Sequence, residues 1–415
     1  GPGAKMSATA ATSRLMPPQR PLNILQVCDH LGWEGSRMHG VKRLFAWMIP
    51  RFDPARFRVS LVSLRKRDLS EETLDALGID ITYLERGKFD PRTLFALLRI
   101  IEAKQVDVLH LHGYGATTFG RVAAAMRGIP VVLHEHANLT STPWFQKVAD
   151  WSLRSYTDVA IAVSKSTADF VIGARLVSPE RVKVVYLGAP LDEFGQPVTP
   201  EERAAARATL RVGPDDVVMG TVTRLHDSKG NEFLVEAARL VLDVRPHARF
   251  FLFGEGPLLE SLQEQAARLN LGDRFVFGGF VKDVRSALAA FDVSVFPSLW
   301  EGTPLTVFEA LGAARPIVAT DADGLMEVLT PDVDALIVPR RDARALADRM
   351  VALIDAPAER ARLGAAARRT AEAYDISAFV RKMERLYDIL HRESRVRHRR
   401  VTTQVDLSFL TGKGV

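Results

Sequence analysis

Residues 298–324, SLWEGTPLTVFEALGAARPIVATDADG, have the pattern of a buried strand end, a tight loop, a helix, a second strand and a further loop. Thr303 is suited to the N-cap of this helix, and Pro304 to its first position, where a missing N–H costs nothing. The amides of Leu305 and Thr306 would then open the helix at the positive end of its dipole. The stretch therefore predicts an anion site, most simply for phosphate.

Two carboxylates flank this predicted anion site. Glu301 and Glu309 stand at E-x7-E spacing, with Gly302 directly after the first. Glu301 would lie in the loop before the helix, and Glu309 in its second turn. A nucleoside diphosphate at the helix start would have a carboxylate on either side, each able to accept hydrogen bonds from hydroxyl groups. Those are the requirements for binding a sugar nucleotide.

The composition describes an ordinary globular protein with more than one domain. The chain has 415 residues, of which 47% are hydrophobic and 25% charged, too many for one ordinary core. Cys28 is the one cysteine, which excludes an internal disulfide or a cysteine-based zinc cluster and suits a reducing cytoplasm. No apolar run approaches the length of a membrane span.

The net charge of +5 comes from the N-terminal half. Residues 1–195 hold 25 Lys and Arg against 19 Asp and Glu, and the remainder holds 30 against 31. This bias fits an anionic surface or acceptor, and it also fits an ordinary solvated face. The bases are scattered and no nucleic-acid-binding motif is present, which argues against nucleic acid as a partner.

Strand and helix patterns alternate along the chain. In the first half, strands are expected at 22–29, 58–64, 79–84, 106–112, 130–136, 158–163 and 182–186, and helices at 38–48, 91–103, 115–126, 143–155 and 165–172. Residues 187–200 are rich in Pro and Gly and are the expected linker. In the second half, strands are expected at 217–222, 249–253, 275–277, 293–296, 316–319 and 335–338, and helices at 230–244, 258–269, 284–290, 343–354, 358–373 and 377–393. The alternation predicts an α/β protein with two doubly wound parallel sheets.

These patterns divide the chain into parts. We expect residues 1–20 to be an unstructured lead, 21–190 an acceptor-side domain, 191–376 a nucleotide-sugar domain, 377–395 a final helix and 396–415 a basic tail. Two such domains leave a cleft between them, and ligands of doubly wound sheets bind outside the carboxyl ends of the strands.

Two cations follow the first strand of the second half, in TRLHDSKG. Arg224 and Lys229 can clamp a diphosphate and neutralise charge on a leaving group, although a solvated loop would also explain them. The turn FGEGP contains Gly254 in G-x-G only, because Leu259 stands where a dinucleotide fingerprint has its third glycine. This argues against a nicotinamide oxidoreductase and favours a tight turn beneath a ligand.

A metal site is not expected. Asp321 and Asp323 form an Asp-x-Asp, which holds a divalent metal in some transferases. Here the pair follows a strand, and no further cluster completes a ligand set. Arg224, Lys229 and the helix terminus already meet the phosphate charge, so we expect no obligatory metal or cofactor.

Histidines end two strands of the first half. Alternation places His110 and His112 on one face of their strand, and His134 and His136 on one face of theirs. The terminal member of each pair lies nearest the cleft, so His136 and then His112 are the candidates for contact with a sugar or phosphate.

Membrane contact is an open alternative at two places. Residues 41–52, VKRLFAWMIPRF, mix bases with large apolar side chains, as a membrane-surface helix does and as a buried helix after a first strand also does. The tail at residues 392–400 is strongly basic and suits anionic lipid or simple solvation.

Most of the chain from residue 22 to about 390 resembles the retaining glycosyltransferases of family 4, which have the GT-B fold. The resemblance is carried by TRLHDSKG, FLFGEGPLLESL, FGGFVKDV and the E-x7-E block, and more loosely by DVLHLHG, PVVLHEH, AVSKST and KVVYLGAP. The motifs are specific to the superfamily and do not identify the substrate.

The resemblance implies roles for matching positions. The donor diphosphate would bind Arg224 and Lys229, the donor sugar Glu301 and the ribose Glu309. Other implied donor contacts are Gly254, Val281 beside the base, and the loop and helix start at Gly302, Thr303, Leu305 and Thr306. His136 would lie near the transferred sugar, and His112 with the loop at Gly35 and Ser36 would serve the acceptor and diphosphate. Ser36 replaces the second glycine of the family loop, Asp323 replaces a glycine near the sugar pocket, and the final helix would cross back to the first domain.

The resulting hypothesis is transfer of a sugar, with retention, from a UDP- or GDP-linked donor to a hydroxyl acceptor. A lipid-linked or polysaccharide acceptor would suit the basic first domain, with the protein in the cytoplasm and peripheral at the inner face of the cell membrane. The alternatives are an epimerase or phosphorylase of the same fold and a non-catalytic sugar-nucleotide-binding protein.

Overall fold

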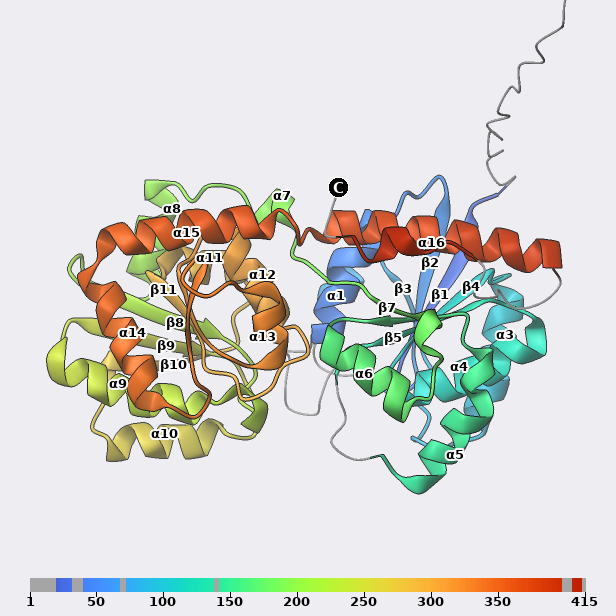
Figure 1. The fold of residues 1–415 in the computed structure, drawn as a ribbon, viewed down its shortest axis with the longest axis horizontal. Coiled ribbons are helices and arrows are strands. Elements are labelled where there is room, and N and C mark those ends of the chain that lie inside the picture. The colour runs from blue at the N-terminus through green and yellow to red at the C-terminus, as the bar shows by residue number, and fades with distance from the viewer. Residues whose placement is uncertain (1–19, 32–39, 68–71, 138–141, 398–404, 413–415) are drawn as a thin grey trace, which may run out of the picture.

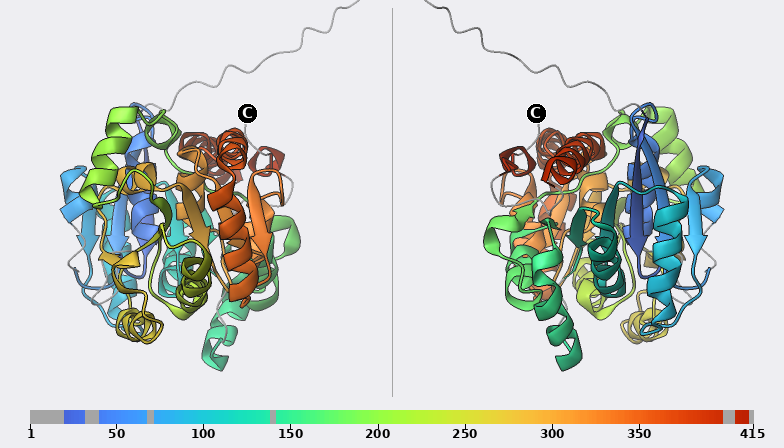
Figure 2. Two further views of the ribbon diagram at one scale, coloured as in Figure 1. Left: turned by 90° about the vertical axis from the view of Figure 1, so that its left-hand side faces the viewer. Right: turned by 90° about the vertical axis from the view of Figure 1, so that its right-hand side faces the viewer.

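The computed structural model describes residues 20–31, 40–67, 72–137, 142–397 and 405–412. These residues form two lobes that lie side by side, each built on one sheet (Figure 1). Views from the two ends show helices on both faces of the sheets (Figure 2). The predicted α/β class with two doubly wound parallel sheets is confirmed.

The N-terminal lobe contains a seven-stranded parallel sheet in the order β3-β2-β1-β4-β5-β6-β7. Its strands are β1 Leu22–Cys28, β2 Phe57–Ser63, β3 Asp80–Tyr83, β4 Val108–His112, β5 Val131–Glu135, β6 Val159–Ala162 and β7 Val182–Val184. β4 and β5 are buried along their whole length, as parallel strands covered on both faces are. The order reverses between β1 and β4, and such switch points are where doubly wound sheets bind ligands.

Helices cover both faces of this sheet. They are α1 Gly40–Met48, α2 Glu72–Ala76, α3 Arg92–Ala103, α4 Tyr114–Arg127, α5 Trp144–Leu153 and α6 Lys165–Ala174. Side chains of α1 and of the last helix, α16 Ile376–Arg397, pack on one face, and those of α3 and α4 pack on the other. Residues 41–52 are therefore mainly core: Phe45 and Met48 are fully buried, which contradicts a membrane-surface helix there.

The C-terminal lobe contains a six-stranded parallel sheet in the order β10-β9-β8-β11-β12-β13. Its strands are β8 Val217–Val222, β9 Ala248–Phe253, β10 Phe275–Gly279, β11 Val293–Phe296, β12 Ile317–Thr320 and β13 Ala335–Val338. Its helices are α8 Pro200–Thr209, α9 Asn231–Val244, α10 Leu259–Arg268, α11 Val284–Ala290, α12 Leu305–Gly312, α13 Asp323–Val328, α14 Ala343–Asp355 and α15 Pro357–Ala371. The switch point lies between β8 and β11, whose following loops hold Arg224, Lys229 and Glu301.

The chain crosses between the lobes twice at one place. Ala189 donates its amide to the Tyr374 carbonyl and accepts from the Ile376 amide, each at 3.1 Å. A Cβ at Gly188 would overlap the Tyr374 backbone, so only glycine fits this close crossing. From there α16 runs over the N-terminal lobe (Figure 1), where Glu384 accepts from the Asp53 amide at 2.8 Å.

Four helices were not expected from the sequence. They are α2, α8, α13 and the short α7 Leu191–Phe194, which lies inside the expected linker. The α8 start carries a readable signal, because Thr199 and Glu202 form a capping box around it. In contrast, every predicted strand lies within two residues of an observed one.

Candidate functional site

An ion pair joins the two loops at the β8/β11 switch point. Lys229 Nζ donates to both carboxylate oxygens of Glu301 at 2.6 and 2.7 Å, and the Ser298 hydroxyl donates to Glu301 at 2.7 Å. Gly230 allows the two loops to approach closely. Its φ is +62°, and the nearby Pro297 carbonyl leaves no room for a side chain at this position. The side chains of Lys229 and Glu301 are 12% and 7% exposed, so a ligand would meet a preformed and largely dry pair.

Arg224 lies in the same loop, two residues past the end of β8 and three residues before the short helical turn Asp227–Lys229. Its guanidinium is half-buried, and no acidic side chain in the described part of the chain forms an ion pair with it. The glycine turn after β9 supports this loop, because Gly256 lies so close to the Leu225 backbone that a Cβ would overlap it. Gly254 in the same turn donates its amide to the Gly279 carbonyl at 2.8 Å. The G-x-G turn thus positions the arginine loop and the β10 end, near which Val281 lies.

The α12 helix begins later than the sequence suggested. Pro304 is its N-cap with φ −73° and ψ 128°, and Leu305 is its first residue. The expectation of Thr303 as N-cap is wrong, because the Thr303 hydroxyl donates instead to the Val163 carbonyl of the other lobe at 3.0 Å. The amides of Leu305 and Thr306 have no hydrogen-bond acceptor among the described residues, so the helix still opens with free donors.

Glu309 is fully buried and forms an ion pair with Arg43, which comes from α1 in the other lobe. Neither Glu309 oxygen accepts a well-directed hydrogen bond from a described residue, so its acceptor capacity remains available. The carboxylate also borders a small cavity together with Thr221 and Ser294, whose hydroxyls likewise have no described partner. A ligand hydroxyl would reach Glu309 only if Arg43 moved aside.

Arg43 is held by more than one group. Its guanidinium lies over the Trp47 ring at 4.9 Å. Burial lowers the pKa of Arg43 to about 10, and the charge of Glu193 opposes that shift. Arg43 therefore stays protonated at neutral pH and covers Glu309 as a cation.

The two lobes touch at the centre of the predicted site. A Cβ on Gly302 would lie 2.7 Å from the His136 carbonyl oxygen, so the E-x7-E loop lies directly against the end of β5. On the other side, Gly324 of α13 packs so closely against the Gly302 carbonyl that it too admits no side chain. His136, predicted to reach across from the other domain, is thus brought beside Glu301, Gly302 and Thr303.

His136 is the end of a buried hydrogen-bond chain. His136 Nε2 lies 2.8 Å from His112 Nδ1, and His112 Nε2 lies 2.7 Å from the Gln26 side-chain oxygen. Because that oxygen accepts, His112 Nε2 carries the proton, and the neutral His112 ring accepts at Nδ1 from His136. This order leaves Nδ1 of His136 as the ring nitrogen with a free lone pair.

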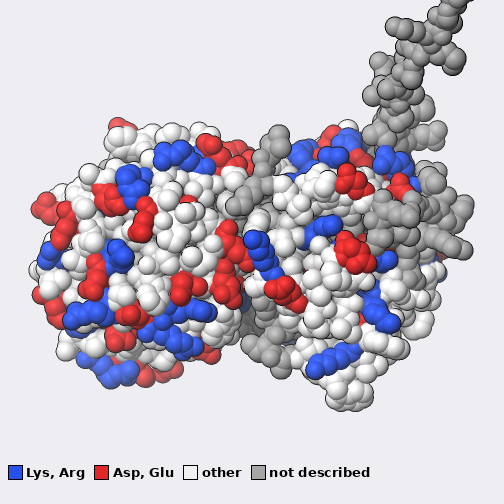
Figure 3. All heavy atoms as spheres, viewed as in Figure 1, with Lys and Arg blue, Asp and Glu red and all other residues white. Residues whose placement is uncertain are grey.

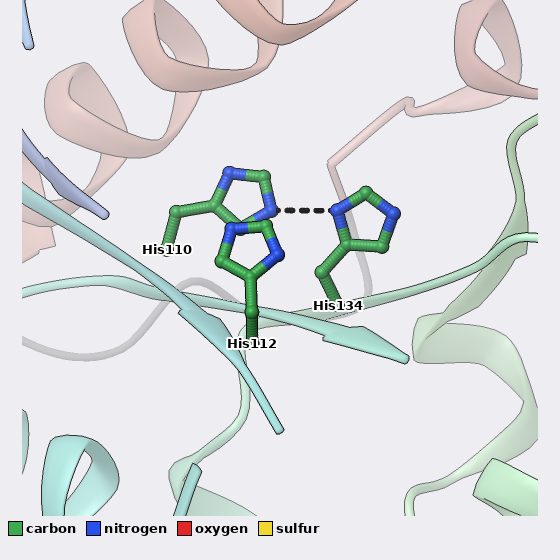
Figure 4. A group of neighbouring side chains, drawn as sticks. All are labelled: His110, His112 and His134. Carbon is green, nitrogen blue, oxygen red and sulfur yellow. Dashed lines mark hydrogen bonds between the residues drawn. The ribbon is translucent and has the colours of Figure 1, made fainter. Parts of the chain in front are cut away.

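The chain continues to the crossing helix. The Gln26 amide donates to the Tyr387 hydroxyl of α16 at 2.9 Å, and that hydroxyl lies 2.6 Å from His110 Nδ1. His110 Nε2 lies 3.0 Å from His134 Nδ1, the bond drawn in Figure 4. His134 Nε2 ends the chain with no described partner.

The histidine rings are stacked. His110 and His134 have centroids 5.1 Å apart with planes 18° from parallel, and His110 and His112 have centroids 4.5 Å apart at 19°. Nitrogens of His110, His112 and His134 lie within 4.8 Å of one another, close enough to consider a metal. The ring nitrogens of His110 and His112 already form hydrogen bonds with Tyr387, His134, His136 and Gln26, so this geometry favours the hydrogen-bond chain.

Burial keeps these histidines neutral. It lowers the pKa of His136 to about 4 and, together with the charge of His136, that of His110 to about 3. It also holds the pKa values of His112 and His134 well below 6.5. The rings therefore act at neutral pH as hydrogen-bonding groups without charge.

The remaining candidates divide into two groups. Asp321 accepts from the Arg340 amide at 3.0 Å and pairs with the Arg340 side chain, whereas Asp323 is the first residue of α13. Gly35 and Ser36 lie outside the described residues. Arg43 and Tyr387 were missed from the sequence, because nothing local in it shows that they meet Glu309 and the histidine chain.

The folds and motifs define a class of protein. The model of the family "Glycosyl transferases group 1" matches residues 216–356, and that of "Glycosyltransferase Family 4" matches residues 38–193. The chain belongs to these glycosyltransferases and has their GT-B fold. The resemblance stated from the motifs is confirmed.

Named relatives are similar along most of the chain. The putative glycosyltransferase EpsD of Bacillus subtilis is 27% identical over 73% of this chain and 83% of its own length. The UDP-Gal:alpha-D-GlcNAc-diphosphoundecaprenol alpha-1,3-galactosyltransferase of Escherichia coli is 24% identical over 64% and 71%. The crystal structure of Anabaena Alr3699/HepE in complex with UDP has a TM-score of 0.76 at 19% identity, covering 89% of this chain and 100% of that one.

Proposed function

We propose that the protein transfers a sugar from a uridine or guanosine diphosphate sugar to a hydroxyl group of an acceptor. One observation carries this proposal: the Lys229–Glu301 pair, the free amides of α12 and His136 of the opposite lobe meet at the Gly302 contact. Cations, free amides and neutral hydrogen-bonding groups around one point suit a diphosphate joined to a sugar.

The donor would lie along the C-terminal lobe. Its diphosphate would meet Arg224, Lys229 and the amides of Leu305 and Thr306, where positive charge and free donors are concentrated. The base would lie near Val281 and the Gly254 turn, and the ribose hydroxyls would bind Glu309 once Arg43 has moved. Glu301 and His136 would hold the sugar, because both are hydrogen-bonding groups beside the α12 start.

We further propose that transfer retains the anomeric configuration and needs no metal. Glu301 is engaged by Lys229 and Ser298, so it is poorly suited to act as a nucleophile. In front-face attack, the acceptor hydroxyl attacks from the side of the leaving diphosphate, which takes the hydroxyl proton. This mechanism requires the protein only to position the reactants and to stabilise the charge of the diphosphate. Arg224, Lys229 and the helix start supply the positive charge for that purpose.

The acceptor is proposed to be lipid-linked. Support comes from the relative whose name specifies a diphosphoundecaprenol acceptor, and from the positive balance of the N-terminal half. No helix within the described ranges is both long and apolar enough to cross a bilayer. A place at the inner face of the cell membrane is part of the same proposal.

The test is release of nucleoside diphosphate from a panel of UDP- and GDP-sugars, with and without a polyprenyl-diphosphate-sugar acceptor. Release that requires both substrates and yields an extended lipid supports the transferase. Release or isomerisation of the donor without acceptor would indicate an epimerase or phosphorylase. Binding without any turnover across the panel would leave a sugar-nucleotide-binding protein.

A further inference from the structure

One face of α5 exposes large apolar side chains to solvent. Trp144, Phe145, Val148 and Trp151 are 76%, 40%, 55% and 58% exposed. Phe145, Val148 and Trp151 follow Trp144 by one, four and seven positions, which places all four side chains on the same side of the helix. The opposite side is buried through Asp150, which accepts from Arg121 at 2.7 Å. The helix is therefore anchored by its polar side and presents its apolar side outward.

A neighbouring loop extends this apolar face. Phe89, 58% exposed, packs edge-on against Phe145 with ring centroids 5.4 Å apart. We call Phe89, Trp144, Phe145, Val148 and Trp151 the aromatic face. Four of the six large exposed aromatic side chains in the described part of the chain belong to it. Such a concentration on one surface marks an interaction site, whereas single exposed apolar residues do not.

Cations surround the aromatic face. Lys147 and Arg154 are exposed on α5, and Lys88 is exposed beside Phe89. Lys88 lies over the Phe89 ring at 5.4 Å and Arg154 over the Trp151 ring at 4.7 Å. In Figure 3 the lower end of the N-terminal lobe, where α5 lies in Figure 1, shows Lys or Arg side chains and white surface without Asp or Glu.

Carboxylates near the aromatic face are largely neutralised. Asp150, the one acidic residue of α5, is buried between Arg121 and Arg175. Asp90 is bound by Arg92 at 2.7 Å. The exposed charge at this surface is therefore mainly positive, which favours an anionic partner.

We propose that the aromatic face and its cations bind the surface of an anionic lipid bilayer, on the premise that the acceptor is lipid-linked as proposed above. Tryptophan and phenylalanine rings partition into the interface between headgroups and acyl chains. Lys88, Lys147 and Arg154 would meet the anionic headgroups, so binding should weaken as the salt concentration rises. This places membrane contact on α5, away from the buried helix α1.

The position of α5 connects this surface with the site. Trp144 follows His136 by only eight residues, and α5 follows the carboxyl end of β5, which touches Gly302. The head group of a membrane-anchored acceptor would thus lie near the end of β5. A second copy of the chain suits the face less well, because a two-fold contact would bring the same cations against one another.

Vesicle binding of the full chain tests the proposal. Flotation with phosphatidylglycerol vesicles should carry the wild-type protein, and flotation with phosphatidylcholine vesicles at physiological salt should not. The variant Trp144→Ser/Trp151→Ser should bind at least ten-fold more weakly, and Lys147→Glu/Arg154→Glu should lose binding with a reduced dependence on salt. Val244→Ser/Val333→Ser, which changes similarly exposed residues of the other lobe, should bind like wild type.

Brominated lipids should quench tryptophan emission in wild type and much less in the tryptophan variant. The proposal is overturned if that variant binds vesicles as wild type does, or if sedimentation shows that the substitutions abolish a dimer and not vesicle binding. Sugar transfer to a detergent-solubilised acceptor without vesicle binding would also overturn it while leaving the transferase standing. Vesicle binding without transfer to any acceptor would preserve the aromatic face and reject the proposed function.

Discussion

Lys229 and Glu301 form an ion pair between side chains of the two loops at the β8/β11 switch point, so their roles can be separated by substitution. Lys229→Met should lower turnover at least a hundred-fold, because a cation facing the leaving diphosphate is lost. It should also lower Tm, because Glu301 is left as an unpaired charge at 7% exposure.

The double variant Lys229→Met/Glu301→Gln is the control for this effect. Removing both charges should recover most of the lost Tm while activity stays low. Initial rates at saturating substrates and thermal denaturation measure the two effects. Near-normal turnover in either variant would reject the assignment of this pair to the site.

The stacked histidines predict a stability change with pH. The folded rings stay neutral, with the pKa of His136 at about 4 and that of His110 at about 3, whereas unfolded histidines titrate near 6.5. Below about pH 6.5 the unfolded chain binds more protons, so the free energy of unfolding should fall as pH decreases towards 4. Each histidine contributes up to about 1.4 kcal/mol per pH unit.

Denaturant unfolding at several pH values measures this slope. His134→Asn should make the slope shallower by about one proton, whereas Val244→Ser, an exposed position in the other lobe that carries no titratable group, should leave it unchanged. An equal slope in wild type and His134→Asn would show that the stack does not exclude protons.

Gly302 fixes where the E-x7-E loop lies against β5. Gly302→Ala would place a Cβ 2.7 Å from the His136 carbonyl, so the loop or the lobe must shift. A displacement of this kind should lower turnover by about ten- to a hundred-fold. Gly173→Ala in α6, where a Cβ meets no atom within 4 Å, is the matched control and should keep wild-type rates. Equal rates in both variants would contradict a close contact during catalysis.

The elements also show what the sequence can and cannot predict. β4, β5 and the strands of the second sheet were predicted within two residues, because buried parallel strands are continuous apolar runs between turn residues. The start of α12 was misplaced because the Thr303 hydroxyl serves the Val163 carbonyl, a contact between lobes. Local capping rules cannot anticipate such a contact, whereas the Thr199–Glu202 capping box is a local signal in the sequence for the start of α8.

The packing of the two lobes brings Arg43 of α1 onto Glu309 of α12, although 266 positions separate them in the sequence. The sequence identifies Glu309 as a site residue but does not show its ion pair with Arg43, because the two side chains meet only when the lobes pack together. Tyr387 is a similar case, since α16 brings it to His110 and Gln26 from the end of the chain. Site residues that lie on a single loop can therefore be predicted from the sequence. Contacts that form only when the two lobes pack together cannot.

Arg43→Ala tests whether this ion pair competes with the donor. The free protein should lose about 2–3 kcal/mol, less than a fully buried pair because Arg43 is 23% exposed. The increase of Tm on adding UDP should become larger, because Glu309 is freed for the ribose hydroxyls. Thermal shift with and without nucleotide measures both. A smaller increase than in wild type would mean that Arg43 binds the nucleotide instead of blocking it.

Calorimetric titration with UDP and GDP shows whether Arg224, Lys229 and the start of α12 bind a nucleoside diphosphate. We predict that wild type binds one of them at one site and that Arg224→Ala weakens this binding at least ten-fold, or about 1.4 kcal/mol, with Tm unchanged. Failure of wild type to bind either nucleotide, or equal affinity in wild type and Arg224→Ala, would contradict the site.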